Sequence, residues 1–321
     1  MSMHFLQSGI LATFFFGGLL SLLSAIGYPG FRRHLLALPC HFRSKLLVMG
    51  LCAPLILGIL VTLFGLLPSW MVDHDEATEH CATHANGMAH LCWFDPLVHL
   101  SDHFWTIGAG LMACVVGYGM IAALLFCLRN RRFQATLNLI SKYDAEHRVY
   151  RIDSERSFVF SAGLFAPRAF ISSQLIEQLS SPHLAVVLAH EQSHCRRRDV
   201  LWRQCLRITG LLHFSPTRRL MLEDLELAQE QICDTEAAQR VGDRLLVAET
   251  LIKIVRQHSV SLPEAHPAIS AFNGSHIELR IRQLLEQPEP LPPSMAWLSA
   301  SLFVLLLSVV VSLTMPLHHL F

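Results

Sequence analysis

Four long apolar stretches dominate the pattern of hydrophobic and polar positions along the chain. They cover residues 5–28, 46–67, 104–128 and 295–317. Each is long enough to cross the hydrocarbon core of a bilayer as a helix, which takes about 20 residues. The first stretch has no basic N-terminal region and no clear small-x-small cleavage site, so we interpret it as a retained helix and not as a signal peptide. The pattern predicts a mainly α-helical membrane protein with four spans.

The segment between the third and fourth spans has the pattern of a folded α+β unit. Residues 130–147 begin as an amphipathic continuation of the third helix, and β-like runs at 149–152, 157–160 and 169–172 predict short strands. These strands either form a sheet whose free edge holds an extended peptide or only cover the helix that follows. Further helices are expected at residues 200–212, 218–239, 244–259 and 275–286, with a Pro- and Gly-containing loop at 262–274.

Composition and charge place this unit relative to the membrane. The chain is 52% hydrophobic and only 16% charged, and its formal net charge of zero gives no reason to expect direct nucleic-acid binding. Of the 25 Lys and Arg residues, four lie between the first two spans and the other 21 between Arg129 and Arg282. By the positive-inside rule, residues 129–294 are cytoplasmic, and both termini lie outside a bacterial inner membrane.

The loop at residues 71–103 is then exposed to the oxidising outer space. It is rich in histidine and contains Cys81 and Cys92. The simpler interpretation is a Cys81–Cys92 disulfide. The alternative is a loop that senses metal or protons, because imidazoles titrate near neutral pH and bind zinc or copper together with thiolates or carboxylates.

A metal-binding motif lies within the predicted cytoplasmic unit. His190 and His194 form an H-E-x-x-H sequence with Glu191, and residues four apart lie one above the other on a helix. Ser181 and Pro182 form an N-cap and N1 pair that starts this helix, and the apolar run that follows predicts a buried element. The arrangement indicates a zinc hydrolase. The alternative is an ordinary core helix with two buried histidines.

A zinc site of this kind needs a third protein ligand and an open position for water. On the acidic helix expected at 218–239, the carboxylates Glu226, Glu230 and Asp234 recur on one face, and their spacing alone does not choose among them. Apolar neighbours suggest that Glu230 is partly buried. Asp199, five residues after His194, either orients a ligand imidazole or pairs with the preceding arginines.

Three segments resemble the integral-membrane gluzincins, most closely the BlaR/MecR-type sensor–transducer peptidases. They are the H-E-x-x-H motif followed by Arg196-Arg197-Arg198-Asp199, the segment Leu212-His213-Phe214-Ser215-Pro216, and the segment Glu230-Gln231-Ile232-Cys233-Asp234. The second segment is similar to an H-W-F-N-P sequence in that family, and the third to an E-x-x-C-D sequence. HtpX-like and prenyl-protein-processing proteases are similar more distantly. The likeness covers residues 149–285.

The resemblance implies that Glu230 is the third zinc ligand and that Asp234 supports the ligands from behind. Phe214 and Ser215 depart from the family, which has Trp and Asn at these positions. The sequence also stops shortly after the fourth apolar stretch, so we expect no C-terminal penicillin-binding sensor domain and have no basis for predicting β-lactam sensing.

Together these observations predict three regions. Residues 1–128 form a three-span membrane region, residues 129–294 a cytoplasmic gluzincin-type zinc metalloprotease domain, and residues 295–321 the fourth transmembrane helix. One Zn²⁺ per chain is expected on His190, His194 and Glu230. Glu191 is the expected general base, and His213 or an arginine is expected to help stabilise the oxyanion.

Three functions fit this prediction. In the first, a signal at the outer loop or in the bilayer activates the protease, which cuts a cytoplasmic protein such as a winged-helix transcriptional repressor. In the second, the protein is a housekeeping protease for membrane-protein quality control. In the third, it is a non-catalytic metal or stress sensor. The presence of every residue that the chemistry requires favours an enzyme.

Overall fold

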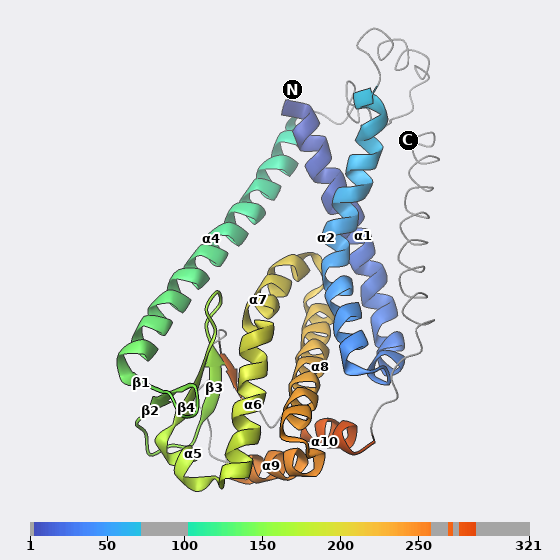
Figure 1. Cartoon of the computed structure of the whole chain (residues 1–321). Coiled ribbons are helices and arrows are strands. Elements are labelled where there is room, and N and C mark those ends of the chain that lie inside the picture. Colours follow the sequence, from blue (N-terminus) through green and yellow to red (C-terminus); the bar gives the residue numbers. More distant parts are fainter. Residues whose placement is uncertain (1–2, 72–101, 258–268, 272–275, 287–321) are drawn as a thin grey trace.

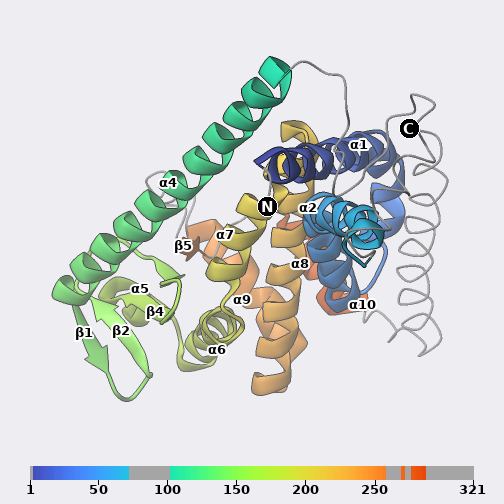
Figure 2. The same ribbon diagram turned by 90° about the horizontal axis from the view of Figure 1, so that it is seen from above.

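The computed structural model describes residues 3–71, 102–257, 269–271 and 276–286. Long helices extend from one end of the molecule, and a small sheet and a group of shorter helices form the other end (Figure 1). Viewed from above, α6 and α8 lie side by side between the sheet and the α1–α2 hairpin (Figure 2).

Helices α1 (Met3–Leu36) and α2 (Cys40–Met71) pack against each other as a hairpin. Glycines allow the close approach: a Cβ on Gly58 would lie 2.5 Å from the Thr13 carbonyl oxygen, and one on Gly17 would lie 2.8 Å from that of Pro54. Among the described residues, Thr13–Leu36 and Cys40–Leu60 are long and apolar enough to cross a membrane. These two segments overlap the first two predicted spans, at residues 13–28 and 46–60.

Helix α4 (Asp102–Ile140) contains the third predicted span. Its middle part carries large apolar side chains that are exposed, among them Met120, Ile121 and Leu124. The predicted fourth span at residues 295–317 lies outside the described residues, as do Cys81 and Cys92 in the predicted outer loop. The four-span arrangement and the disulfide therefore stay predictions.

The sheet has the strand order β1-β2-β4-β3-β5. Its strands are β1 (Ser141–Asp144), β2 (Val149–Ile152), β3 (Val159–Ala162), β4 (Arg168–Ser172) and β5 (Ile269–Ala271). Strand β2 is parallel to β4, and the other pairs are antiparallel. The predicted strands at 149–152 and 169–172 are thus close to β2 and β4, while the one at 157–160 forms two residues later.

Two strands were not predicted, and they change the predicted peptide-binding edge. Residues 141–144 leave the helix and form β1, because the Asp144 carboxylate accepts hydrogen bonds from the backbone N–H groups of Glu146 and His147 and closes a turn. Strand β5, expected as part of a loop, pairs with the outer edge of β3. The expectation of a free edge along residues 157–172 is therefore wrong for this structure.

The helical part comprises α5 (Ser173–Gln178), α6 (Ser181–Arg197), α7 (Asp199–Thr209), η1 (Gly210–Leu212), α8 (Ser215–Val241), α9 (Arg244–Gln257) and α10 (Ile277–Glu286). Helix α6 begins next to Pro182, as expected, with Ser180 as its N-cap, one residue earlier than predicted. Its apolar side packs into a core shared with the sheet and α9, which includes Ile171, Val187 and Leu251. This packing fixes α6 rigidly.

Helix α6 ends where the chain turns sharply at Arg198. This residue adopts the left-handed conformation (φ 55°, ψ 41°), and α7 begins at the next residue. The turn brings Asp199 back beneath the last turn of α6. The left-handed conformation costs a non-glycine residue roughly 1–2 kcal/mol, so contacts around it must hold it in place.

Helix α8 connects the α1–α2 hairpin to the rest of the molecule. Asp224 of α8 accepts hydrogen bonds from the Tyr28 hydroxyl at 2.7 Å and from Arg32 at 2.7 and 2.8 Å. Arg43 of α2 also donates to the side chain of Gln231. The helix that binds the hairpin therefore also carries the acidic residues of the predicted metal site.

Candidate metal centre

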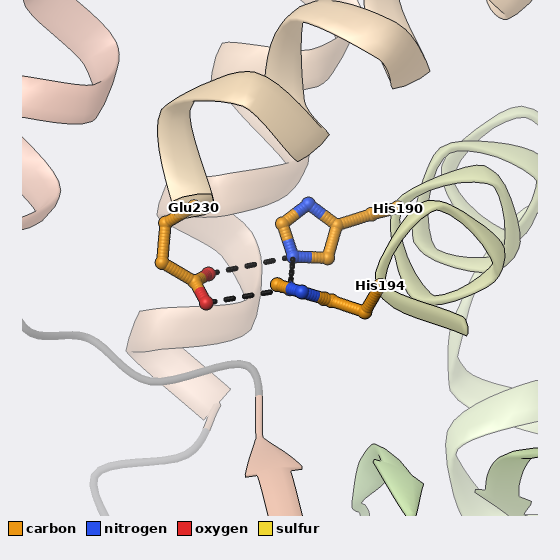
Figure 3. Close-up of side chains that lie close together, drawn as sticks. All are labelled: His190, His194 and Glu230. Carbon is orange, nitrogen blue, oxygen red and sulfur yellow. Dashed lines mark hydrogen bonds and ion pairs between the residues drawn. The ribbon is translucent and has the colours of Figure 1, made fainter. Parts of the chain in front are cut away.

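Helices α6 and α8 bring three candidate ligands together (Figure 3). His190 and His194 lie one turn apart on α6, and Glu230 faces them from α8. The two Nε2 atoms are 3.2 Å apart, and the Glu230 oxygens lie 3.4 Å from His190 Nε2 and 3.3 Å from His194 Nε2. All three side chains are buried. The predicted ligands thus converge on one point inside the protein.

Two further carboxylates contact the imidazoles at their Nδ1 atoms, on the side away from the common point. His190 Nδ1 lies 3.0 Å from Asp234 Oδ1, and His194 Nδ1 lies 2.8 Å from Asp199 Oδ2. A carboxylate only accepts hydrogen bonds, so the bond to Asp199 places the proton of His194 on Nδ1, and the ion-pair contact with Asp234 favours the same tautomer for His190. Each Nε2 then presents a lone pair to the common point. This is the tautomer that a metal-binding histidine requires.

The three distances match a tetrahedral ion. Ligand atoms at 2.0–2.1 Å from a tetrahedral centre are about 3.3–3.4 Å apart, and the structure has 3.2, 3.3 and 3.4 Å. The two lone pairs that converge at 3.2 Å repel each other unless a cation lies between them. Two imidazoles and one carboxylate are also the donor set of many catalytic zinc sites. The residues therefore fit a bound divalent metal.

Arg280 of α10 completes the centre, and the sequence did not identify it. Its Nε and Nη2 donate to the two oxygens of Asp234, both at 2.8 Å, and its Nη1 lies 3.2 Å from Glu230 Oε2. The residue is fully buried. The sequence does contain an indication of this role, because Arg280 lies on the apolar face of its helix, between Ile277 and Leu284. A cation buried on such a face needs an anionic partner.

Glu191 lies beside the ligands and is completely buried. Neither of its carboxylate oxygens has a hydrogen-bond partner among the described residues. Burial raises the pKa of Glu191 above its usual value. A carboxylate in such a setting readily takes a proton, which suits a general base.

The centre attracts positive charge. Burial raises the pKa of Glu230, but the charges of His194 and Arg280 outweigh burial and hold this pKa well below its usual value. Burial lowers the pKa of His190, but Asp234 and Glu230 outweigh burial and raise it. For His194, Cys233, Glu230 and Asp199 together outweigh burial and place the pKa well above 6.5. Without a metal ion, protons therefore compensate the buried carboxylates.

Cys233 lies next to this network. Its sulfur is 3.4 Å from His194 Nδ1 and 3.7 Å from Asp199 Oδ2. Burial raises the pKa of Cys233 to about 11, although the charge of His194 acts in the opposite direction. A thiol that donates to Asp199 helps to fix this carboxylate against His194.

The other predicted site residues have different partners. Glu226 is partly exposed and pairs with Arg203 at 3.0 Å. Asp199 contacts both predicted partners, because its second oxygen lies 3.4 Å from Arg197 Nε. His213 is outside the cluster of ligand atoms: its Nε2 forms a 3.0 Å hydrogen bond with the carbonyl oxygen of Gly50 in α2. The predicted oxyanion role of His213 receives no support from this position.

A buried H-E-x-x-H helix with Glu230 facing it from a second helix, beside two apolar N-terminal helices, is the arrangement expected of a membrane-associated metallopeptidase. The family described as BlaR1 peptidase M56 matches residues 109–284, which is more than half of the chain. The chain belongs to this family of metallopeptidases. The predicted likeness to BlaR/MecR-type peptidases is thus confirmed, whereas the more distant likeness to HtpX stays a prediction. A search of curated proteins gives no match.

We expect Glu230→Gln to lose bound metal, because the amide removes both the negative charge and one ligand atom. Glu226→Gln is the matched control, one turn earlier on α8 and bonded to Arg203 instead of the imidazoles. Metal content after dialysis, measured by mass spectrometry, should fall close to zero in the first variant and stay at wild-type level in the second. Equal metal content in both variants would show that Glu230 is not the third ligand.

Proposed function

We propose that this protein is a membrane-bound zinc endopeptidase that cleaves a cytoplasmic protein. The observation that carries the proposal is the tetrahedral spacing of His190, His194 and Glu230 with the buried carboxylate of Glu191 beside them. Bound zinc supplies a Lewis acid that lowers the pKa of water and polarises a peptide carbonyl.

The protein's own residues perform the proton transfers. Glu191 takes a proton from the attacking water and passes it to the leaving amine. Asp234 and Asp199 hold the two imidazoles in the required tautomer and orientation. Arg280 holds Glu230 and Asp234 and balances part of their charge. The burial of these groups strengthens every charge interaction in the centre.

We further propose that α1, α2 and α4 cross a bacterial inner membrane, together with the predicted span at 295–317. The distribution of Lys and Arg supports a cytoplasmic position for the metal centre and an outer position for both termini. The substrate that family membership favours is a transcriptional repressor, cut in response to an envelope signal. Docking of the α1–α2 hairpin on α8 gives a physical connection between the bilayer and the helix that carries Glu230.

The substrate proposal is tested by comparing newly formed protein N-termini in cells that express either the wild type or Glu191→Gln. A repressor that is cut only by the wild type would support it. Fragments of many unrelated membrane proteins would instead indicate a housekeeping protease. Identical sets of N-termini, together with full zinc content in the wild type, would indicate a non-catalytic sensor.

We expect metal affinity to fall as the pH falls. The pKa values of His190 and His194 are raised in the metal-free centre, so protons compete with metal at pH values above the usual 6.5 for histidine. Where both imidazoles are protonated, affinity should fall by about two log units per pH unit. Competition with a zinc chelator between about pH 5 and 8 measures this dependence. An affinity that starts to fall only below the ordinary histidine range would contradict it.

A further inference from the structure

The turn between α7 and α8 lies against the middle of the apolar hairpin (Figure 1). The backbone N–H of Phe214 donates to the Ser21 hydroxyl of α1 at 3.1 Å, and His213 Nε2 bonds to the Gly50 carbonyl of α2 at 3.0 Å. Thr209 Oγ1 lies 3.6 Å from the Cys52 sulfur. We call residues 208–216 the tip of the α7–α8 hairpin.

The contacts of the tip lie deep within the apolar segments. At about 1.5 Å per residue, Ser21 is about 12 Å from one end of Thr13–Leu36 and about 22 Å from the other. Gly50 is about 15 Å from either end of Cys40–Leu60. Even when the span is counted from Leu46, after the last basic residue, Gly50 lies about 6 Å inside. The tip is therefore level with the hydrocarbon region of a bilayer that these helices cross.

Non-helical backbone is tolerated at this depth only where its polar groups are paired. The structure pairs three of these N–H groups. His213 N–H donates to Gly210 O at 3.0 Å, Phe214 N–H donates to Ser21, and Arg218 N–H donates to Phe214 O at 2.9 Å. Pro216 has no N–H to satisfy. Ser21, a polar residue in an apolar helix, is fully buried by this contact.

The outer side of the tip is apolar and exposed. Leu211 is 53% and Phe214 52% exposed, and Trp202 and Ile208 of α7 are exposed as well. Exposed aromatic and aliphatic side chains gathered at one place mark a binding surface. Because the tip contacts α1 and α2, lipid around these helices in the proposed membrane position would also cover its outer side.

Arg207 directly precedes the tip in the sequence, and Arg218 lies two residues after it. A cavity of about 620 Å³ lies between α4 and the α7–α8 hairpin, lined by four arginines but only two glutamates. Arg203 and Arg219 pair with the two glutamates at 3.0 and 2.9 Å. Arg207 and Arg218 form no ion pair with any described carboxylate. The α4 side of the cavity is apolar, with Tyr118 and Ala122 among its residues. A ligand with an anionic head and an apolar chain fits both sides.

We propose that the tip is embedded in the cytoplasmic leaflet of the membrane and that Arg207 and Arg218 bind the phosphate of an anionic phospholipid in this cavity. The inference rests on the proposed crossing of the bilayer by α1 and α2. The α7–α8 hairpin then holds the predicted protease domain, residues 129–294, at the membrane, in addition to the proposed spans that precede and follow this domain.

The position of the tip is tested with the photoreactive residue p-benzoyl-phenylalanine in place of Leu211 or Phe214, in the full chain within bacterial membranes. The same residue in place of Leu23 of α1, which is 56% exposed, tests whether α1 contacts lipid. In place of Leu245 of α9, which is 68% exposed, it is the control for a surface outside the membrane. After irradiation we expect lipid adducts by mass spectrometry at the tip and at Leu23, but not at Leu245. Adducts at Leu23 without adducts at the tip would overturn the inference alone. No adducts at Leu23 would overturn the proposed span as well.

The phosphate site is tested by native mass spectrometry with phosphatidylglycerol and phosphatidylcholine. The wild type should retain phosphatidylglycerol preferentially, and the Arg207→Gln/Arg218→Gln variant should lose about tenfold or more of this preference. Arg282→Gln, an exposed arginine of α10 outside the cavity, is the control for net charge. Equal retention of phosphatidylglycerol by wild type and double variant would overturn the site, as would binding of an acidic peptide in its place.

Discussion

Glu191→Gln should abolish peptide hydrolysis and leave the metal in place. The substitution keeps the shape of the side chain but removes the group that accepts the proton of the attacking water. Loss of a general base costs about 10²–10⁴-fold in rate. Because Glu191 is not one of the three converging ligands, zinc content should equal that of the wild type. Hydrolysis of a fluorogenic peptide and metal analysis of the same preparation measure both quantities.

The same variant should be at least as stable as the wild type. A fully buried carboxylate without a hydrogen-bond partner is unfavourable for folding, and groups retained for function commonly cost stability. Glu223→Gln is the matched control, since this partly exposed carboxylate on α8 pairs only with Arg219 among the described residues. Its activity and unfolding should resemble those of the wild type. Retained hydrolysis by Glu191→Gln in a clean preparation would exclude the proposed role.

The motif and its helix could be predicted because both are local. An H-E-x-x-H sequence in an apolar helix fixes the relative positions of His190 and His194 whatever surrounds them. The acidic face of α8 also narrowed the third ligand to three carboxylates. The structure separates them by their partners: Glu226 bonds to Arg203, Asp234 to Arg280, and Glu230 faces the imidazoles. Spacing along one helix carries no information about such partners.

The failures of prediction share a non-local cause. Strand β5 pairs with β3 across more than a hundred residues, so the local pattern at 269–271 could not reveal it. His213 is expected near the metal from its place in the sequence, but its bond to Gly50 depends on how α2 packs against η1. Arg280 lies 46 residues from Asp234, and only the tertiary fold brings the two together.

Arg280→Met should lower both stability and metal affinity strongly. The guanidinium group is fully buried and contacts Asp234 with two hydrogen bonds and Glu230 with a third contact. Its removal leaves two buried carboxylates without their cation, and breaking a buried pair in this way costs about 3–5 kcal/mol. Groups that hold a metal ligand from behind affect affinity by about 10–100-fold. Arg280→Lys should recover only part of either loss, because an ammonium group cannot form the two parallel hydrogen bonds to Asp234.

The two effects are separated by measuring unfolding with a chelator present and zinc affinity by competition. Arg282→Gln is the matched control on the same helix, since Arg282 is exposed and pairs only with Glu286 among the described residues; its stability should change by no more than about 0.5 kcal/mol. Adding Asp234→Asn to Arg280→Met removes one uncompensated charge and should restore part of the stability but not the zinc affinity, because His190 then loses its carboxylate partner. If the free energy of unfolding and the zinc affinity of Arg280→Met instead equal those of Arg282→Gln, α10 contributes only packing. The two carboxylates then hold the imidazoles without help from the guanidinium group.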